Sequence, residues 1–203
     1  MSNNSLTILA STKLPTQFGV FDFTVFRIDN DPREHIFLTM GDVKNSDTPV
    51  LTRIHSECAT GESFMSLKCD CREQLLQSMQ MIQEEGRGLL IYLNQEGRGI
   101  GLVNKIKAYH LQEQGLDTVE ANEQLGLPVD NRNFLAAIAV FDYFSIQNIR
   151  LLTNNPDKIK VLQDTGHIQV TRVPLQITPN AINKGYLLTK QKKMGHLLDL
   201  KED

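Results

Sequence analysis

Three cysteines are the residues of this chain whose type and spacing point most directly to chemistry. They are Cys58, Cys69 and Cys71, and the 203-residue sequence contains no others. Thiolates are good ligands for Zn²⁺, and in a strand the side chains of Cys69 and Cys71 would point to the same face. Ten residues separate Cys58 from Cys69, enough for a loop to bring the third sulfur to that face. The spacing therefore predicts a candidate zinc site.

The number of ligands bears on what such a site does. Structural zinc usually has four protein ligands, whereas catalytic zinc has three and keeps one position for water or substrate. Three cysteines thus favour an open, catalytic site. Two alternatives stay open at this point. His55 as a fourth ligand would close the site, and without a metal the cysteines would be reduced thiols that pack as small apolar side chains.

A glycine-rich segment follows the apolar run at residues 89–93. Residues 95–101 read Gln-Glu-Gly-Arg-Gly-Ile-Gly and precede a predicted helix, a position that favours anion binding. Leu102 stands where a dinucleotide-binding fingerprint has its third glycine, and the chain has no Walker A sequence. A tight turn explains the glycines equally well. Glu96 and Arg98 add a carboxylate for a purine amino group and a guanidinium for phosphate.

Polar residues gather at three further places. Residues 53–58 read Arg-Ile-His-Ser-Glu-Cys, which indicates either a site or a solvated edge strand. Asp130 precedes an apolar helix, where capping is its default role. Residues 153–158 form a strand-to-helix junction, either a phosphate contact or a plain turn. Tyr109 lies within a predicted helix, where an aromatic side chain usually belongs to the core.

The pattern of apolar residues predicts the elements that position these groups. Residues 6–43 are rich in β-branched and aromatic residues and predict antiparallel strands with a turn at 29–32. Further strands are predicted at 50–55, 89–93, 149–153 and 168–175, and helices at 74–86, 102–114, 133–146 and 156–162. The order predicts an α+β or mixed α/β fold, with a β-rich half followed by alternating helices and strands. We expect a single domain over residues 1–203.

Composition narrows the class of protein. The chain is 40% hydrophobic and 22% charged, with a net charge of -3, as in soluble globular proteins. It has no basic excess to drive general binding to nucleic acid. Residues 1–6 lack a secretion-signal pattern, and no apolar run approaches the ~20 residues that span a bilayer. With an odd cysteine count that gives no disulfide framework, we expect a cytoplasmic protein without nucleic-acid or membrane partners.

Together the motifs resemble the GTP cyclohydrolase II family. The segments that carry the resemblance are Arg53-Ile-His-Ser-Glu-Cys58, Lys68-Cys-Asp-Cys71, Gln95-Glu-Gly-Arg98, Asp130-x-Arg132, Leu151-Leu-Thr-Asn-Asn-Pro156 and Lys193-Met-Gly-His196. They follow the family's order and spacing, from about Lys13 to Leu198. The resemblance implies an enzyme that opens the imidazole ring of GTP, releases formate and pyrophosphate, and so begins riboflavin biosynthesis.

The resemblance also implies ligands for metal and substrate. Cys58, Cys69 and Cys71 would hold zinc, with a water completing the site, and magnesium would neutralise the triphosphate through ligands that the sequence does not identify. The positions that match the family's GTP-binding residues are Arg53, Ile54, His55, Ser56, Glu57, Gln74, Glu96, Gly97, Arg98, Thr118, Thr153 and Lys158.

Catalytic roles follow from the same resemblance. Asp130 matches the proton acceptor, and Arg132 matches the nucleophile toward the α-phosphorus. A guanidinium is normally protonated, so stabilisation of phosphate charge is the alternative role for Arg132. Tyr109 matches the tyrosine associated with complete ring opening and loss of formate.

The sequence departs from the family pattern beside the cysteines, where Arg72 replaces the usual glycine and Lys68 the usual arginine. The family is typically homodimeric, and we expect no fused second enzyme. Two other functions stay open: a paralogue that opens GTP for another pathway, and a non-catalytic GTP sensor with structural zinc. The C-terminal Tyr186, Lys190 and Lys193 would either fold over the site or form a solvated face.

Overall fold

In the residues that the structure describes, seven β-strands form one mixed sheet in the order β1-β2-β3-β5-β4-β6-β7. The structure is a computed structural model that describes residues 5–44, 46 and 48–200. Residues 1–4 and 201–203 lie outside this range. The predicted absence of a secretion signal rests partly on the first of these segments, and the predicted role of the C-terminal segment partly on the second.

The chain divides into two units, which we describe separately. The sheet unit comprises the residues up to His55, Leu75–Asn94 and Asn133–Leu175. The helical unit comprises Ser56–Gln74, Gln95–Arg132 and the residues from Gln176 on. The predicted site residues therefore form two groups, one in each unit.

The strands lie close to their predicted positions. They are β1 (Leu6–Thr16), β2 (Gly19–Ile28), β3 (His35–Met40), β4 (Val50–Ser56), β5 (Gly88–Leu93), β6 (Asn148–Leu152) and β7 (Gln169–Val173). The pairs β1/β2, β2/β3 and β3/β5 are antiparallel, whereas β4/β6 and β6/β7 are parallel. This mixed sheet, with its helices, confirms the predicted mixed α/β fold.

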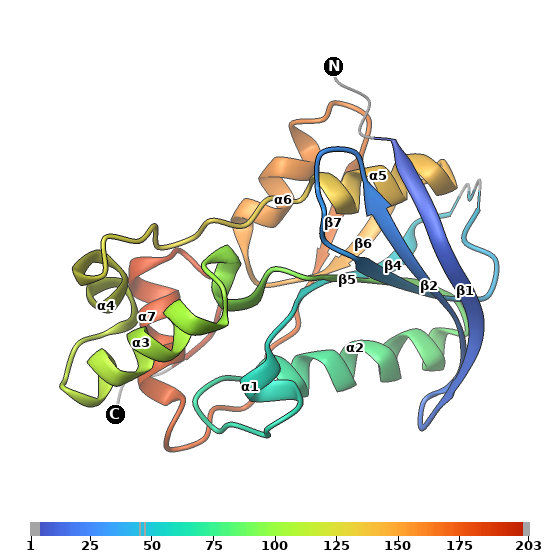
Figure 1. Cartoon of the computed structure of the whole chain (residues 1–203). Coiled ribbons are helices and arrows are strands. Elements are labelled where there is room, and N and C mark those ends of the chain that lie inside the picture. The colour runs from blue at the N-terminus through green and yellow to red at the C-terminus, as the bar shows by residue number, and fades with distance from the viewer. Residues whose placement is uncertain (1–4, 45, 47, 201–203) are drawn as a thin grey trace. The chain divides into compact units, whose positions relative to one another are not determined.

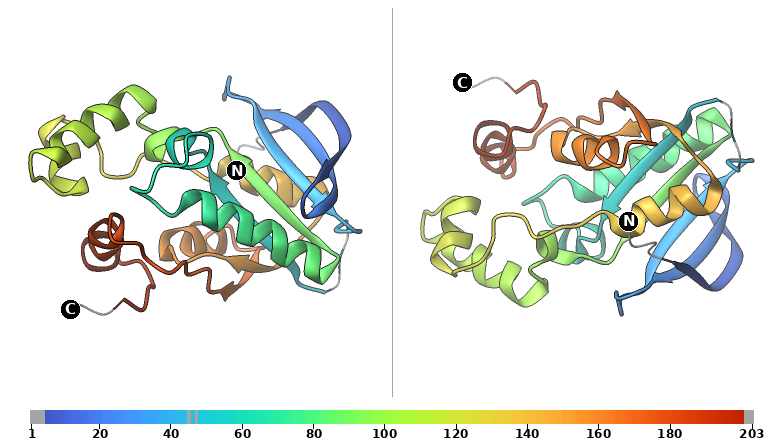
Figure 2. Two further views of the ribbon diagram at one scale, coloured as in Figure 1. Left: turned by 90° about the horizontal axis from the view of Figure 1, so that it is seen from below. Right: turned by 90° about the horizontal axis from the view of Figure 1, so that it is seen from above.

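Helices cover both faces of the sheet (Figures 1 and 2). The part of α2 (Cys71–Glu85) that belongs to the sheet unit lies on one face, and α5 (Leu135–Phe144) and α6 (Pro156–Gln163) lie on the other. The start of α6 follows from its sequence, because the Asn155 side chain accepts a hydrogen bond from the backbone N–H of Asp157, and Pro156 takes the first helical position.

Each face of the sheet has its own apolar core. On the α5 side, Phe26 and Phe37 pack with Val140 and Phe141 in the larger cluster. On the α2 side, Leu51 and Leu90 pack with Ile82. Strand β5 is therefore buried on both faces, which is why residues 89–93 are an almost unbroken apolar run.

The helical unit consists of shorter elements. They are α1 (Ala59–Glu62), the 3₁₀ helix η1 (Glu96–Gly99), α3 (Leu102–Glu113), α4 (Thr118–Gln124) and α7 (Lys184–Lys193). Sequence patterns predicted α3 but not α1, α4 or α7. Helix α4 contacts both α3 and α7, and it begins with a capping box formed by Asp117 and Glu120. Among the helices in the described range, none is both long and apolar enough to cross a membrane.

The packing of α2 leads to a first prediction. Ile82 is 0% exposed in the core on the α2 side, whereas Leu76 on the same helix is 37% exposed. We expect Ile82→Ala to lower the free energy of unfolding by about 2–5 kcal/mol, because it leaves a cavity beneath the sheet. Urea denaturation measures the change. Leu76→Ala is the matched control and should cost less than about 1 kcal/mol; equal losses would contradict this account of the core.

Candidate active site

The three cysteine sulfurs converge in the helical unit. Their Sγ atoms all lie within 4.8 Å of one another, and those of Cys58 and Cys69 are 3.7 Å apart. All three are free thiols. The strand expected around Cys69 and Cys71 is wrong: Cys69 lies in the loop between α1 and α2, and Cys71 is the first residue of α2. Three soft sulfur donors at this spacing fit a single metal ion such as Zn²⁺.

The sulfur cluster packs against the backbone of α1, which Cys58 immediately precedes. A Cβ atom placed on Gly61 would lie 2.7 Å from the Sγ of Cys69 and 3.2 Å from the Sγ of Cys58. Both distances are too short for a carbon–sulfur contact without movement. Glycine at this position therefore gives the two sulfurs the space in which to meet.

Lys105, on α3, connects the sulfur cluster to the glycine-rich loop. Its Nζ donates hydrogen bonds to Cys58 Sγ at 3.0 Å and to Glu96 Oε1 at 2.8 Å. Burial lowers the pKa of Lys105, but the hydrogen bonds to Glu96 and Cys58 outweigh it, so the pKa lies above the usual value. Sequence reasoning missed Lys105, because a lysine on an otherwise ordinary helix carries no motif signal.

The charge of Lys105 also bears on the protonation of the cysteines. Hydrogen bonds from Cys69 and Cys71, together with that from Lys105, hold the pKa of Cys58 well below its usual value. The hydrogen bond to Cys58 raises the pKa of Cys69 to about 11. Cys58 is therefore the first of the three to become a thiolate, the form in which cysteine binds metals.

Glu96 ties the start of the glycine-rich loop to α1. Its Oε2 accepts a hydrogen bond from the Ala59 backbone N–H at 2.6 Å, and its Oε1 accepts one from the Gly97 N–H at 2.6 Å. The loop then needs its glycines. Gly97, Gly99 and Gly101 all have left-handed φ angles, and a Cβ on Gly99 would lie 2.7 Å from the carbonyl oxygen of Asn131.

Arg98, in the same loop, has a partly unsatisfied guanidinium. Its own φ of 59° is unusual for a residue with a side chain. Its Nη2 donates a hydrogen bond to the Tyr186 hydroxyl at 3.3 Å, whereas its buried Nη1 has no hydrogen-bond partner within the described part of the chain. A buried donor without an acceptor is costly, and an anionic ligand would satisfy it.

Asp130 and Arg132 form a tight pair. The Arg132 Nε donates to both carboxylate oxygens of Asp130, at 2.9 and 3.1 Å, and its Nη2 donates to Oδ2. Burial of Asp130 disfavours its charge, but the hydrogen bonds from Arg132 outweigh this and hold the pKa of Asp130 below its usual value. The default capping role is wrong, because α5 begins at Leu135 with Phe134 at its N-cap.

Tyr109 is half-buried on α3, with its hydroxyl 3.5 Å from Thr60 Oγ1. The Nζ atoms of Lys68 and Lys105 lie 4.8 and 5.8 Å from the centre of its ring. Burial raises the pKa of Tyr109 to about 12, so the phenol keeps its proton near neutral pH. It is available there as a hydrogen-bond or proton donor.

Three other predicted residues of this unit lie beside the same loops. Gln74 Nε2 donates to Asp70 Oδ2 at 2.6 Å, and Ser56 Oγ accepts from Gln95 Nε2 at 3.0 Å. Burial, with the nearby charge of Glu96, raises the pKa of Glu57 above its usual value.

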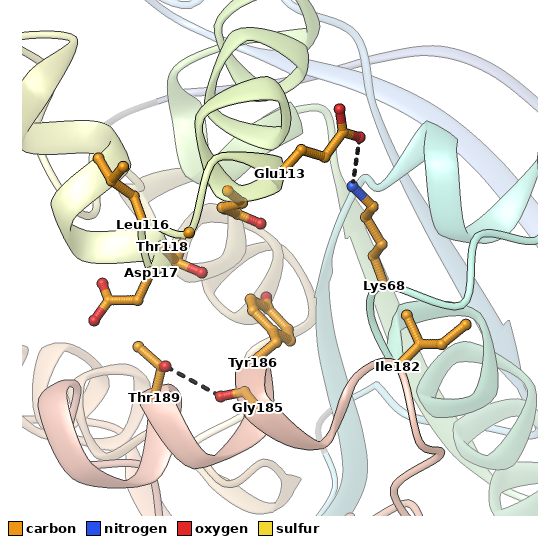
Figure 3. A pocket seen from close by; sticks show the side chains of 11 residues that line it. Lys68, Glu113, Leu116, Asp117, Thr118, Ile182, Gly185, Tyr186 and Thr189 are labelled. Carbon is orange, nitrogen blue, oxygen red and sulfur yellow. Dashed lines mark hydrogen bonds and ion pairs between the residues drawn. The ribbon is translucent and has the colours of Figure 1, made fainter.

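Thr118, the first residue of α4, lines a pocket of about 420 Å³ (Figure 3). The pocket is lined by Lys68, Gln112, Glu113, Gly115, Leu116, Asp117, Thr118, Ile182, Gly185, Tyr186 and Thr189. None of the cysteines lines it.

The remaining predicted residues belong to the sheet unit, around the ends of β4 and β6. Arg53 Nη1 donates to the Leu152 carbonyl oxygen at 2.8 Å, and Lys158 Nζ donates to that of Ile54 at 2.8 Å. The His55 ring stacks on Tyr92 with ring centres 5.6 Å apart.

Thr153, which follows β6, accepts a hydrogen bond from the Asn155 N–H at 3.1 Å. All five predicted residues of the sheet unit are buried. The alternative of a solvated edge strand at 53–58 is wrong, because β4 lies between β5 and β6.

The close approach at Gly61 leads to a second prediction. We expect Gly61→Ala to weaken binding of Zn²⁺ or Co²⁺ by at least about tenfold, because the added methyl group displaces the sulfurs of Cys58 and Cys69. Competition with a chelator measures the affinity. Gly185→Ala is the control, since a Cβ there meets no described atom within 4 Å. An unchanged affinity in Gly61→Ala would contradict the assignment of these sulfurs as ligands.

The fold is shared with a solved structure of low sequence identity. It is the crystal structure of a two-domain 3,4-dihydroxy-2-butanone 4-phosphate synthase from A. baumannii, which matches with a TM-score of 0.50 at 14% identity over 84% of this chain. This chain covers 41% of that protein. At such identity the likeness concerns the fold alone.

Sequence comparison is far more specific. A protein named GTP cyclohydrolase-2 from Neisseria meningitidis serogroup A is 54% identical over 193 residues, which are 95% of this chain and 97% of the relative. One of the same name from Haemophilus influenzae is 50% identical over 94% of this chain and 88% of its own length. The profile of the family described as GTP cyclohydrolase II matches residues 7–174. With a match of this extent, the chain belongs to the GTP cyclohydrolase II family.

Proposed function

We propose that this chain hydrolyses GTP, opening the imidazole ring to release C8 as formate and removing pyrophosphate, as the first step of riboflavin biosynthesis. Family membership and relatives named GTP cyclohydrolase-2 support this activity. The structural observation that carries the proposal is that three clustered thiols, a glycine-rich loop with a buried arginine, and the Asp130–Arg132 pair all belong to one unit.

We propose Zn²⁺ as the metal held by Cys58, Cys69 and Cys71. When bound, zinc lowers the pKa of a water ligand to about 7 and so supplies hydroxide for hydrolysis near neutral pH. Lys105 contributes a positive charge that partly offsets the negative charges of the three thiolates in the zinc-bound site. It also holds Cys58 and Glu96 in fixed positions. Mg²⁺ is proposed to neutralise the triphosphate.

The loop that contains Arg98 is proposed to bind the substrate. Glu96 is held by three donors, which fixes the loop in the conformation that buries the Arg98 guanidinium. The unpartnered Nη1 of Arg98 supports contact with an acceptor on GTP, such as a phosphate oxygen. The family's other GTP positions are proposed to bind the same substrate: Arg53, Ile54, His55, Ser56, Glu57, Gln74, Gly97, Thr118, Thr153 and Lys158.

For Arg132 we favour the electrostatic role over nucleophilic attack. The pKa of Asp130 is lowered, so its carboxylate is too weak a base to remove the guanidinium proton. A protonated Arg132, oriented by two carboxylate oxygens, can stabilise charge on the α-phosphate. Asp130 as proton acceptor stays a prediction.

Tyr109 is proposed to assist complete ring opening. Its pKa of about 12 keeps the phenol protonated near neutral pH, which suits donation of a hydrogen bond or proton as formate leaves. A complete set of Asp130, Arg132 and Tyr109 also favours an enzyme over a GTP sensor.

Further proposals concern the setting of the reaction. We propose that residues 1–203 act as one catalytic domain in the cytoplasm, where thiols stay reduced. We also propose a homodimer, which is supported by the exposed apolar side chains of Leu102, Val103 and Ile106 on α3. The absence of nucleic-acid and membrane partners stays a prediction.

The activity is tested by measuring formate and pyrophosphate released from GTP with Mg²⁺, before and after zinc is removed and restored. We expect both products in equal amounts, lost with zinc and recovered on its return. Pyrophosphate without formate would indicate incomplete ring opening. Tight GTP binding without either product would contradict the proposal in favour of a sensor. Rescue of a riboflavin auxotroph would separate this pathway from that of a paralogue.

The role of Arg132 is tested with Arg132→Lys and Arg132→Met. If charge is what matters, the lysine variant should keep pyrophosphate release within about tenfold to a hundredfold of wild type, whereas the methionine variant should lose far more. The rate of pyrophosphate release, measured at saturating GTP, distinguishes the electrostatic role from the nucleophilic one. Trapping of a phosphoramidate on Arg132 would contradict the electrostatic role.

A further inference from the structure

Helix α7 follows the region that the family profile matches, which ends at residue 174. The sequence left its role open between a cover for the site and a solvated face. In the helical unit, residues of α7 and of the turn before it contact the loop that carries Cys69 and leads into Cys71, the first residue of α2. This loop, residues 63–70, has no regular secondary structure. Its conformation therefore depends on contacts with other segments.

Two asparagines before α7 hold the backbone of this loop. Asn183 Nδ2 donates to the carbonyl oxygen of Cys69 at 3.3 Å, and Asn180 Nδ2 donates to that of Leu67 at 3.3 Å. The asparagines also fix each other: the Asn180 N–H donates to Asn183 Oδ1 at 2.9 Å, and the Asn183 N–H donates to Asn180 Oδ1 at 2.8 Å. Asn183 is buried, so water does not compete for the hydrogen bond that its side-chain amide donates.

Lys190 holds the residue between the two cysteines. Its Nζ lies 3.2 Å from Asp70 Oδ1, and the two side chains are only 12% and 3% exposed. The other oxygen of Asp70 accepts the Gln74 amide at 2.6 Å. By contrast, Lys193 on the same helix is 46% exposed, and it pairs with Asp117 and Glu120 on α4.

The same helix reaches the glycine-rich loop. The Lys190 Nζ lies 4.3 Å from the centre of the Tyr186 ring, and the Tyr186 hydroxyl accepts from Arg98 Nη2 at 3.3 Å. The Tyr186 ring thus lies near two cations, Arg98 and Lys190, and cations are attracted to the face of an aromatic ring. Helix α7 contacts both the cysteine loop and the proposed substrate loop.

We propose that Asn180, Asn183 and Lys190 form a latch that positions Cys69 and Cys71 for metal binding. Residues 63–70 have no regular secondary structure, so they need anchors that hold Cys69, and Cys71 just after it, close to Cys58 before the metal arrives. The latch supplies two hydrogen bonds to the loop backbone and one ion pair to the residue between the ligands. Lys190 is a positioning residue. This inference rests on the proposed zinc site.

The latch is tested by the rate at which the zinc-loaded, full-length protein releases Zn²⁺ to a coloured chelator. We expect Lys190→Met to accelerate release about tenfold to a hundredfold, the range typical of residues that orient metal ligands. The Lys190→Met substitution leaves the buried Asp70 carboxylate without the cation that pairs with it. Lys190→Arg, which keeps the charge, should restore most of the slow release.

Lys193→Met is the matched control, because it removes the same charge from the exposed part of the same helix, and it should release zinc at the wild-type rate. Asn183→Ala provides a second variant in case Lys190→Met does not fold, and it should accelerate release in the same direction. In the metal-free proteins, amide hydrogen exchange of residues 66–74 should be faster in both variants than in wild type.

The outcomes separate the latch from the metal site itself. If wild type binds no zinc, the proposed metal centre fails. If wild type binds one zinc and both Lys190→Met and Asn183→Ala release it at the wild-type rate, the latch is wrong and the metal centre stands. Equal acceleration by Lys193→Met would also overturn the latch, because the effect would then belong to the overall charge of the helix.

Discussion

The convergence of three cysteine sulfurs is the constraint on which the helical unit depends. The sulfurs lie within 4.8 Å of one another, and two lysines on other helices lie in their surroundings. Lys105 donates directly to Cys58, while Lys190 pairs with Asp70 between the other two cysteines. A metal ion bound there would add the largest positive charge, and the protein supplies the geometry to hold it.

Close backbone contacts in the helical unit also dictate where the chain can have side chains. Gly61 lies against two of the sulfurs, and Gly99 lies against the carbonyl oxygen of Asn131, so in both places the backbone replaces a side chain. The loop of Gly97, Arg98 and Gly99 has left-handed backbone conformations throughout. Strain of this kind persists where surrounding contacts fix it. Here Glu96 does so through hydrogen bonds to Ala59 and Gly97.

The sheet unit meets a different requirement, that of holding buried polar side chains in fixed positions. Arg53 and Lys158 donate to carbonyl oxygens at the ends of neighbouring strands, and His55 stacks on Tyr92. These groups are fixed by the sheet and the core beneath it. Such preorganisation lowers the entropic cost of binding a ligand. Both units thus use rigid backbone elements to hold groups that the sequence places in short polar runs.

The sequence by itself determined the strands, the helices α2, α3, α5 and α6, and the candidates for the site, because apolar periodicity and the motif spacing of Cys58, Cys69 and Cys71 are local properties. It did not determine how the cysteines meet. They converge from the starts of two helices and a loop, rather than along a strand. The roles of Lys105 and Lys190 were decided by tertiary structure alone, since each lies far along the chain from the sulfur or carboxylate that it contacts. A lysine on a helix looks solvated in sequence, and only packing shows that its charge is buried against a partner of opposite sign.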